Sequence, residues 1–183
     1  MIPELGLLSD KLASRVQTNK ISLVSESESS FRIESQVEDS FPLSVSFAEG
    51  RYEIEAAWWH SDYEDPNQAF AAVCWLLTPY FRVVASFTQD EIIATWLESY
   101  TDQGWEATKY LYFVDPANLE SPVENADIIK IQTQAVFLDS SFTTHFPAAH
   151  LDQAGYPLGT ILGETSYERR EDGWYPVGVP TAE

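Results

Sequence analysis

The sequence predicts an α+β fold: a mainly antiparallel sheet covered by one buried helix, with an amphipathic helix at the N-terminus. Three features support this class: consecutive segments that alternate apolar and polar residues, one segment that is apolar nearly all round, and an opening segment with helical spacing. The chain has 183 residues, of which 44% are hydrophobic. That length and composition are typical of one packed domain, so we expect residues 1–183 to form a single α+β domain.

The first predicted element is an amphipathic helix over residues 3–18. It begins with a proline, which suits the first helical turn, and it places Leu5, Leu8, Leu12 and Val16 at spacings of three and four. We expect this helix to pack at an edge of the sheet.

The period then changes from helical to alternating. Four half-buried antiparallel strands are predicted, with Glu49-Gly50 as one of the turns between them, in ISLVSE (21–26), SFRIESQ (30–36), LSVSFAE (43–49) and RYEIEAAW (51–58).

A second helix is predicted over Asn67–Leu77, after a loop HSDYEDP. Asp65 is suited to cap it and Pro66 to occupy its first turn. Because the helix is apolar nearly all round, we place it across one face of the sheet. Cys74, the only cysteine, lies in this run, and we expect it to be a small core residue.

The second half of the chain is read mainly as strands. Residues 88–100 fit either a helix or a strand, and we favour a strand because the turn at 101–104 leads into WEATKYLYFV as in a hairpin. Pro176 would restrict the last strand to an edge of the sheet. The strand segments are 81–87, 105–114, 127–138, 166–170 and 174–179.

The charge is strongly negative, with 29 acidic residues against 10 basic ones and a net charge of −19. Such a field repels nucleic acid and anionic membranes and accelerates encounter with a basic protein. We therefore expect a partner protein with a basic surface and no nucleic-acid partner. The alternative is that the acidity only keeps the protein soluble.

No segment approaches the length of an apolar membrane span, and the N-terminus lacks the uninterrupted apolar stretch of a signal peptide. A single cysteine allows no internal disulfide. These features predict a cytoplasmic protein without membrane association.

The candidate binding surface is a cluster of aromatic and acidic residues between the fourth predicted strand and the second helix. Adjacent tryptophans cannot both point inward from one strand, so one would be exposed or lie under a further layer. Aromatics in an acidic rim make good binding anchors. The candidate residues are Trp58, Trp59, His60, Asp62, Glu64 and Asp65.

Motifs for catalysis or for a cofactor are weak. The acidic run at 60–65 has neither a second histidine at helical spacing nor the glycine and distal glutamate of a calcium loop, so we predict no metal and no cofactor. His60, His145 and His150 have the intrinsic pKa of a general base, but no nucleophile motif accompanies them. We nominate no catalytic residue and favour a protein that is not an enzyme.

Two segments resemble known families. Residues 51–87, RYEIEAAWWHSDYEDPNQAFAAVCWLLTPYFRVVASF, resemble small acidic immunity proteins of bacterial toxin systems, which implies a non-enzymatic inhibitor of a basic toxin. GYPLGTILGETSYERR, residues 155–170, is similar to the Pro-Leu-Gly segment of chorismate-lyase-like proteins, which implies a small-molecule enzyme. The earlier strands lack the arginine that acts in the lyase family. The sequence therefore favours an acidic binding protein of the immunity or inhibitor type, with a small-molecule binder or an accessory subunit as alternatives.

Overall fold

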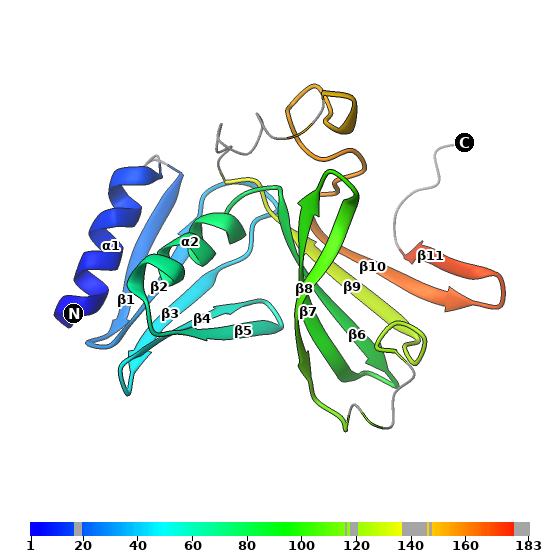
Figure 1. The fold of residues 1–183 in the computed structure, drawn as a ribbon, viewed down its shortest axis with the longest axis horizontal. Coiled ribbons are helices and arrows are strands. Elements are labelled where there is room, and N and C mark those ends of the chain that lie inside the picture. Colours follow the sequence, from blue (N-terminus) through cyan, green and yellow to red (C-terminus); the bar gives the residue numbers. More distant parts are fainter. Residues whose placement is uncertain (17–19, 116, 118–120, 137–145, 147, 178–183) are drawn as a thin grey trace.

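The computed structural model confirms the α+β class and distributes the strands over two antiparallel sheets (Figure 1). It describes residues 1–16, 20–115, 117, 121–136, 146 and 148–177. Within these residues the first sheet has five strands and the second has six. The sequence analysis predicted strands of one sheet and did not predict their division between two sheets.

The first sheet is a meander in which each strand pairs with the next along the chain. Glu49 and Gly50 both have positive φ, as a two-residue hairpin turn requires, and they connect the third strand to the fourth. The strands are β1 (Ile21–Ser27), β2 (Ser30–Ser35), β3 (Leu43–Ala48), β4 (Arg51–Ala56) and β5 (Trp59–Tyr63).

Strand β5 corrects the sequence analysis, which assigned HSDYEDP to a loop. The chain reverses at Ala57 and Trp58, where Ala57 has a φ of 54°, and Trp59 then pairs with Ala56. Alternation continues through the polar residues: Ser61 is buried, whereas His60 and its neighbour Asp62 are exposed. A strand of polar residues carries no apolar alternation, which is why the pattern did not reveal it.

Both helices cover the same face of the first sheet (Figure 1). Helix α1 (Pro3–Arg15) buries Leu5, Leu8 and Leu12, so it lies over the sheet beside the second helix and not at an edge as predicted. Helix α2 (Pro66–Leu76) is the predicted buried helix, and Cys74 is buried within it. Neither helix has the length and apolar character needed to cross a membrane, nor does any other helix of the described residues.

The second sheet has the strand order β11-β10-β9-β6-β7-β8, and every neighbouring pair is antiparallel. The ambiguous segment 88–100 is a turn followed by a strand, as favoured: Gln89 and Asp90 have positive φ. Pro176 lies in the edge strand, as predicted. The bounds are β6 (Phe81–Thr88), β7 (Glu91–Thr101), β8 (Gly104–Tyr112), β9 (Ile128–Thr133), β10 (Gly163–Arg170) and β11 (Gly173–Val177).

One hydrophobic core extends from the helices into the second sheet. Val83 on β6 and Leu97 on β7 belong to the same buried cluster as the residues that α1 and α2 cover. Gln134, which follows β9 and is 1% exposed, donates from Nε2 to the Leu76 carbonyl oxygen at 2.9 Å and accepts from the Phe41 amide at 3.2 Å. This buried amide joins the loop before β3, the end of α2 and the second sheet.

Candidate functional site

The side of the first sheet away from the helices carries a set of acidic residues. On β4 and β5, residues of one parity are buried under the helices, as Ile54 and Ser61 are. Those of the other parity lie on the opposite side of the sheet, because successive side chains of a strand alternate. We call this surface the acidic face and define it by Glu53, Glu55, His60, Asp62 and Glu64.

Two like charges stand opposite each other at the centre of the acidic face. Glu53 on β4 pairs in register with Asp62 on β5, and Glu55 pairs with His60. Within the described residues, no Lys, Arg or His nitrogen lies within 4.0 Å of a carboxylate oxygen of Glu53, Glu55 or Asp62. Like charges directly opposite each other destabilise a sheet, so this arrangement has an energetic cost.

The arginines on this side of the sheet are paired with other acids. Arg51 contacts Glu64 at 3.2 Å between Nη2 and Oε1. Arg32 on β2 contacts Glu26 at 3.4 Å and Glu34 at 2.9 Å. As far as the described part of the chain shows, these pairs leave the carboxylates of Glu53, Glu55 and Asp62 uncompensated.

Asp65, a predicted contact residue, has a structural role. Its Oδ1 accepts a hydrogen bond from the Asn67 amide at 2.9 Å, and it is the N-cap of α2. A carboxylate at this position satisfies an amide that has no partner within the helix. Asp65 is exposed beside the acidic face, but its own hydrogen bond holds it at the end of the helix.

Trp59 does not belong to a partner surface, and the structure corrects that prediction. Its side chain is 1% exposed and packs in the core under the helices. Its indole Nε1 is buried and has no hydrogen-bond acceptor among the described residues. Trp59 pairs in register with Ala56, and residues directly opposite each other on neighbouring strands lie on the same side of the sheet. Ala56 is buried, which agrees with the position of Trp59 on the covered side.

Trp58 is half-buried between the two sheets. It occupies the tip of the β4–β5 hairpin, which points toward the second sheet (Figure 1). Its ring meets Phe87 of β6 edge-on, with 6.0 Å between centroids, and Lys130 Nζ of β9 lies 5.8 Å from its centroid. Trp58 is therefore a contact between the sheets, and of the two tryptophans predicted as anchors for a partner only Trp59 is excluded by its burial.

The two described histidines, His60 and His150, lie on separate elements. His60 lies on the acidic face, and His150 lies in a short 3-10 helix, where its carbonyl oxygen accepts from the Tyr100 hydroxyl at 3.1 Å. His145 lies outside the described residues. Among the residues that the structure describes, no group of three or more His, Cys, Asp or Glu side chains is placed to hold a metal ion.

Comparison of this chain with protein-family models, with curated proteins and with solved structures finds no match. The class of protein is therefore described by its architecture. It is an α+β protein of two antiparallel sheets, with both helices on one side of the first sheet and an acidic face on the other side.

Sequence reasoning missed two members of the acidic face. Glu53 and Glu55 were read only as the polar positions of an alternating strand, although that alternation already places them on one side. Their relation to Asp62 depends on β5, which was not predicted. Recognising β5 as a strand would have shown that Glu53 and Asp62 face each other.

Proposed function

We propose that this protein is a non-enzymatic binding protein of the immunity or inhibitor type, whose acidic face binds a basic surface on a partner protein. The observation that carries the proposal is the unpaired like-charge arrangement of Glu53 opposite Asp62. The resemblance of residues 51–87 to immunity proteins of toxin systems covers both of these residues. A cytoplasmic location and the lack of a nucleic-acid partner belong to the same proposal.

A bound cation would relieve the repulsion between the acids of the acidic face. Two carboxylates directly opposite each other on neighbouring strands cost roughly 0.2–1 kcal/mol relative to a neutral pair. A lysine or arginine of a partner placed between them would replace this repulsion by attraction. The acidic face therefore gains more from binding a cation than isolated surface acids do, since the repulsion is already present in the free protein.

The chemistry of the face also sets the kind of binding. Its residues are acids and one histidine, and of the two tryptophans beside it Trp59 is buried and Trp58 contacts Phe87 of the second sheet. Association should therefore depend on electrostatic steering, which raises the association rate and makes it sensitive to salt.

The test is affinity capture from a lysate of the source organism, followed by association kinetics with the captured protein. Glu53→Lys combined with Asp62→Lys should abolish capture of a basic protein that the wild type retains. With the purified partner, the double variant should associate at least several-fold more slowly and show a flatter dependence on salt. Surface-plasmon resonance at a series of salt concentrations measures both quantities.

A matched control reverses the same number of charges elsewhere. Glu168→Lys combined with Glu171→Lys changes two exposed acids, one on β10 and one in the turn between β10 and β11, and alters the net charge equally. If both double variants slow association to the same extent, net charge alone is responsible and the acidic face is not the binding site. Equal capture by the wild type and the Glu53/Asp62 variant would also reject the proposal.

A further inference from the structure

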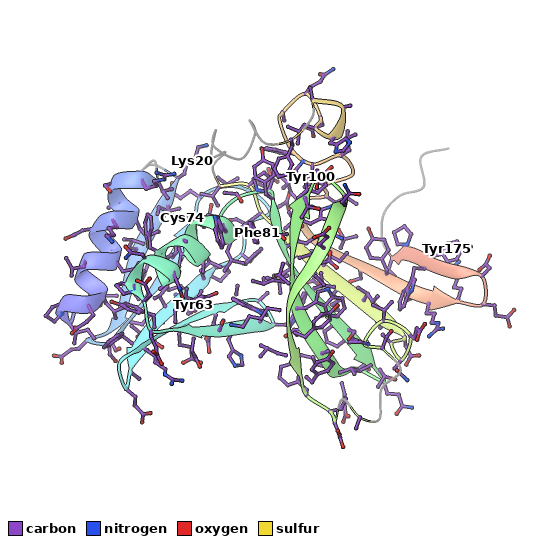
Figure 2. The ribbon with its side chains drawn as sticks, in the orientation of Figure 1. Lys20, Tyr63, Cys74, Phe81, Tyr100 and Tyr175 are labelled. Atoms are coloured by element: carbon purple, nitrogen blue, oxygen red, sulfur yellow. The ribbon has the colours of Figure 1, made fainter. Side chains whose placement is uncertain are left out.

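A groove of about 400 Å³ lies between helix α2 and the second sheet. Its walls are largely apolar and come from Ala72, Trp75 and Leu76 of the helix and from Phe81 and Leu97 of the sheet. In Figure 2, Phe81 at the start of β6 and Tyr63 on β5 both lie next to α2. The volume falls within the range of small-molecule sites, and apolar walls with few polar groups are typical of them.

The outer wall is an aromatic pair, in which Trp75 is exposed and Phe81 is half-buried. The Trp75 side chain is 42% exposed, although it belongs to a helix whose other large apolar residues are mostly buried. Its ring stacks on Phe81 with 5.3 Å between centroids and 2° between the ring planes. The exposed part of the Trp75 ring is an apolar surface that an aliphatic or aromatic body can cover.

Among the described residues that line this groove, Lys109 is the one cation, and none of the described acids pairs with it. Lys109 Nζ of β8 contacts the Ser61 hydroxyl and lies 5.4 Å from the Tyr63 ring centroid and 5.9 Å from that of Trp59. Within the described residues, no carboxylate oxygen lies within 4.0 Å of this ammonium group. Lys109 is itself exposed, so a ligand that enters the groove can reach its ammonium group.

Lys130 provides an internal comparison. It too lies near two aromatic rings, 5.8 Å from the centroid of Trp58 and 5.4 Å from that of Phe87, but it pairs with Glu164 at 3.3 Å. The two lysines therefore differ: Lys130 has Glu164 as its acidic partner, whereas near Lys109 the described residues supply no anion.

We propose that this groove binds a small organic anion with an apolar body. The body would lie against Trp75 and Phe81, and its carboxylate or equivalent charge would pair with Lys109. The inference does not rest on the acidic face, because Ser61 and Tyr63 point to the side of β5 opposite His60 and Asp62.

The contact of Lys109 with Ser61 does not indicate covalent catalysis. A hydroxyl activated by an amine must be reachable by a substrate. Ser61 is 4% exposed and does not line the groove, whereas Lys109 does. The hydroxyl therefore positions the ammonium group, and the ammonium group supplies charge for binding.

The test is isothermal titration calorimetry of the full chain with three probes. Octanoate carries both the apolar body and the charge, octanamide has only the body, and acetate has only the charge. We expect octanoate to bind with a Kd in the micromolar to millimolar range, and each of the other probes to bind at least about tenfold more weakly. Octanamide binding as tightly as octanoate, or no detectable octanoate binding, would overturn the proposal.

Substitutions in the groove distinguish the contribution of the Lys109 charge to ligand binding from that of apolar packing. Lys109→Gln should weaken octanoate binding at least about tenfold, and Lys109→Arg should restore most of it. Trp75→Ala should weaken octanoate and octanamide alike, and Lys130→Gln is the matched control that should leave binding unchanged. Melting temperatures of all variants establish that they are folded. If Lys130→Gln weakens binding as much as Lys109→Gln, the anion does not bind at this groove.

Discussion

The adjacent tryptophans show what a single residue's position in a strand determines. On one strand the two neighbours would face opposite sides, but in the structure Trp58 lies in the turn and only Trp59 lies in β5. The sequence alone did not say which of them is buried. The hairpin turn at Ala57 and Trp58 decides it, because the chain has already reversed when Trp59 pairs with Ala56.

Arg82 tests how much the planar guanidinium group of one arginine contributes to the stability of the fold. Its Nε and Nη2 both lie 2.5 Å from Glu98 Oε2, and its guanidinium lies 4.1 Å from the Trp105 ring centroid. Lysine cannot reproduce both contacts, so Arg82→Lys should lower the free energy of unfolding by about 1–2 kcal/mol. Urea denaturation followed by circular dichroism measures this change.

Arg51→Lys is the control, since Arg51 is 57% exposed and its partner Glu64 is 78% exposed. A solvent-screened pair of this kind should change stability by less than about 0.5 kcal/mol. Equal effects of the two substitutions would mean that the Arg82 contacts add nothing beyond an ordinary surface pair.

At the scale of elements, the sequence predicted most helices and strands correctly where apolar residues follow a single period. β7 was ambiguous because both of its faces are buried: Ile93, Ala94, Thr95, Trp96 and Leu97 are all buried, which removes the alternation. β5 was missed for the opposite reason, since its polar residues outnumber its apolar ones. The turn at Gln89-Asp90 contains no glycine, so it gave no clear signal of the hairpin.

The start of α2 provides a test at this scale. Asp65→Ala removes the acceptor for the Asn67 amide and should destabilise the protein by about 1 kcal/mol, whereas Asp65→Ser should retain most of the stability. Asp62→Ala, three residues earlier on the acidic face, should leave stability unchanged or slightly increased because it removes the repulsion with Glu53. Thermal unfolding of the three variants checks the order. A loss at Asp62 as large as that at Asp65 would show that the acidic face contributes to stability.

At the scale of the whole molecule, the partition into two sheets could not be predicted. It depends on pairings between distant segments, such as β6 with β9, that leave no local pattern in the sequence. The arrangement of the candidate site also depends on strand pairing, so the sequence predicted only part of it. The charge and the region were apparent, but the opposition of Glu53 and Asp62 and the burial of Trp59 follow from the pairing of β4 with β5.

The continuous core predicts that the two sheets unfold together. Val83 and Leu97 share one buried cluster with the helices, and Trp58 packs on Phe87 across the junction. Hydrogen-exchange mass spectrometry at increasing urea should therefore show β3 and β7 losing protection at the same concentration. Separate losses would mean that residues 1–183 comprise two independently stable units.

Trp58→Ala tests the junction directly. Removing a half-buried ring should lower the free energy of unfolding by about 2 kcal/mol, and β3 and β7 should still lose protection together, because the core cluster continues beneath the ring. Trp174→Ala is the control: this ring packs against the smaller cluster within the second sheet, so its loss should destabilise the protein without affecting the junction. If Trp58→Ala separates the two losses of protection and Trp174→Ala does not, then Trp58 is the principal link between the sheets and the shared core alone cannot couple them.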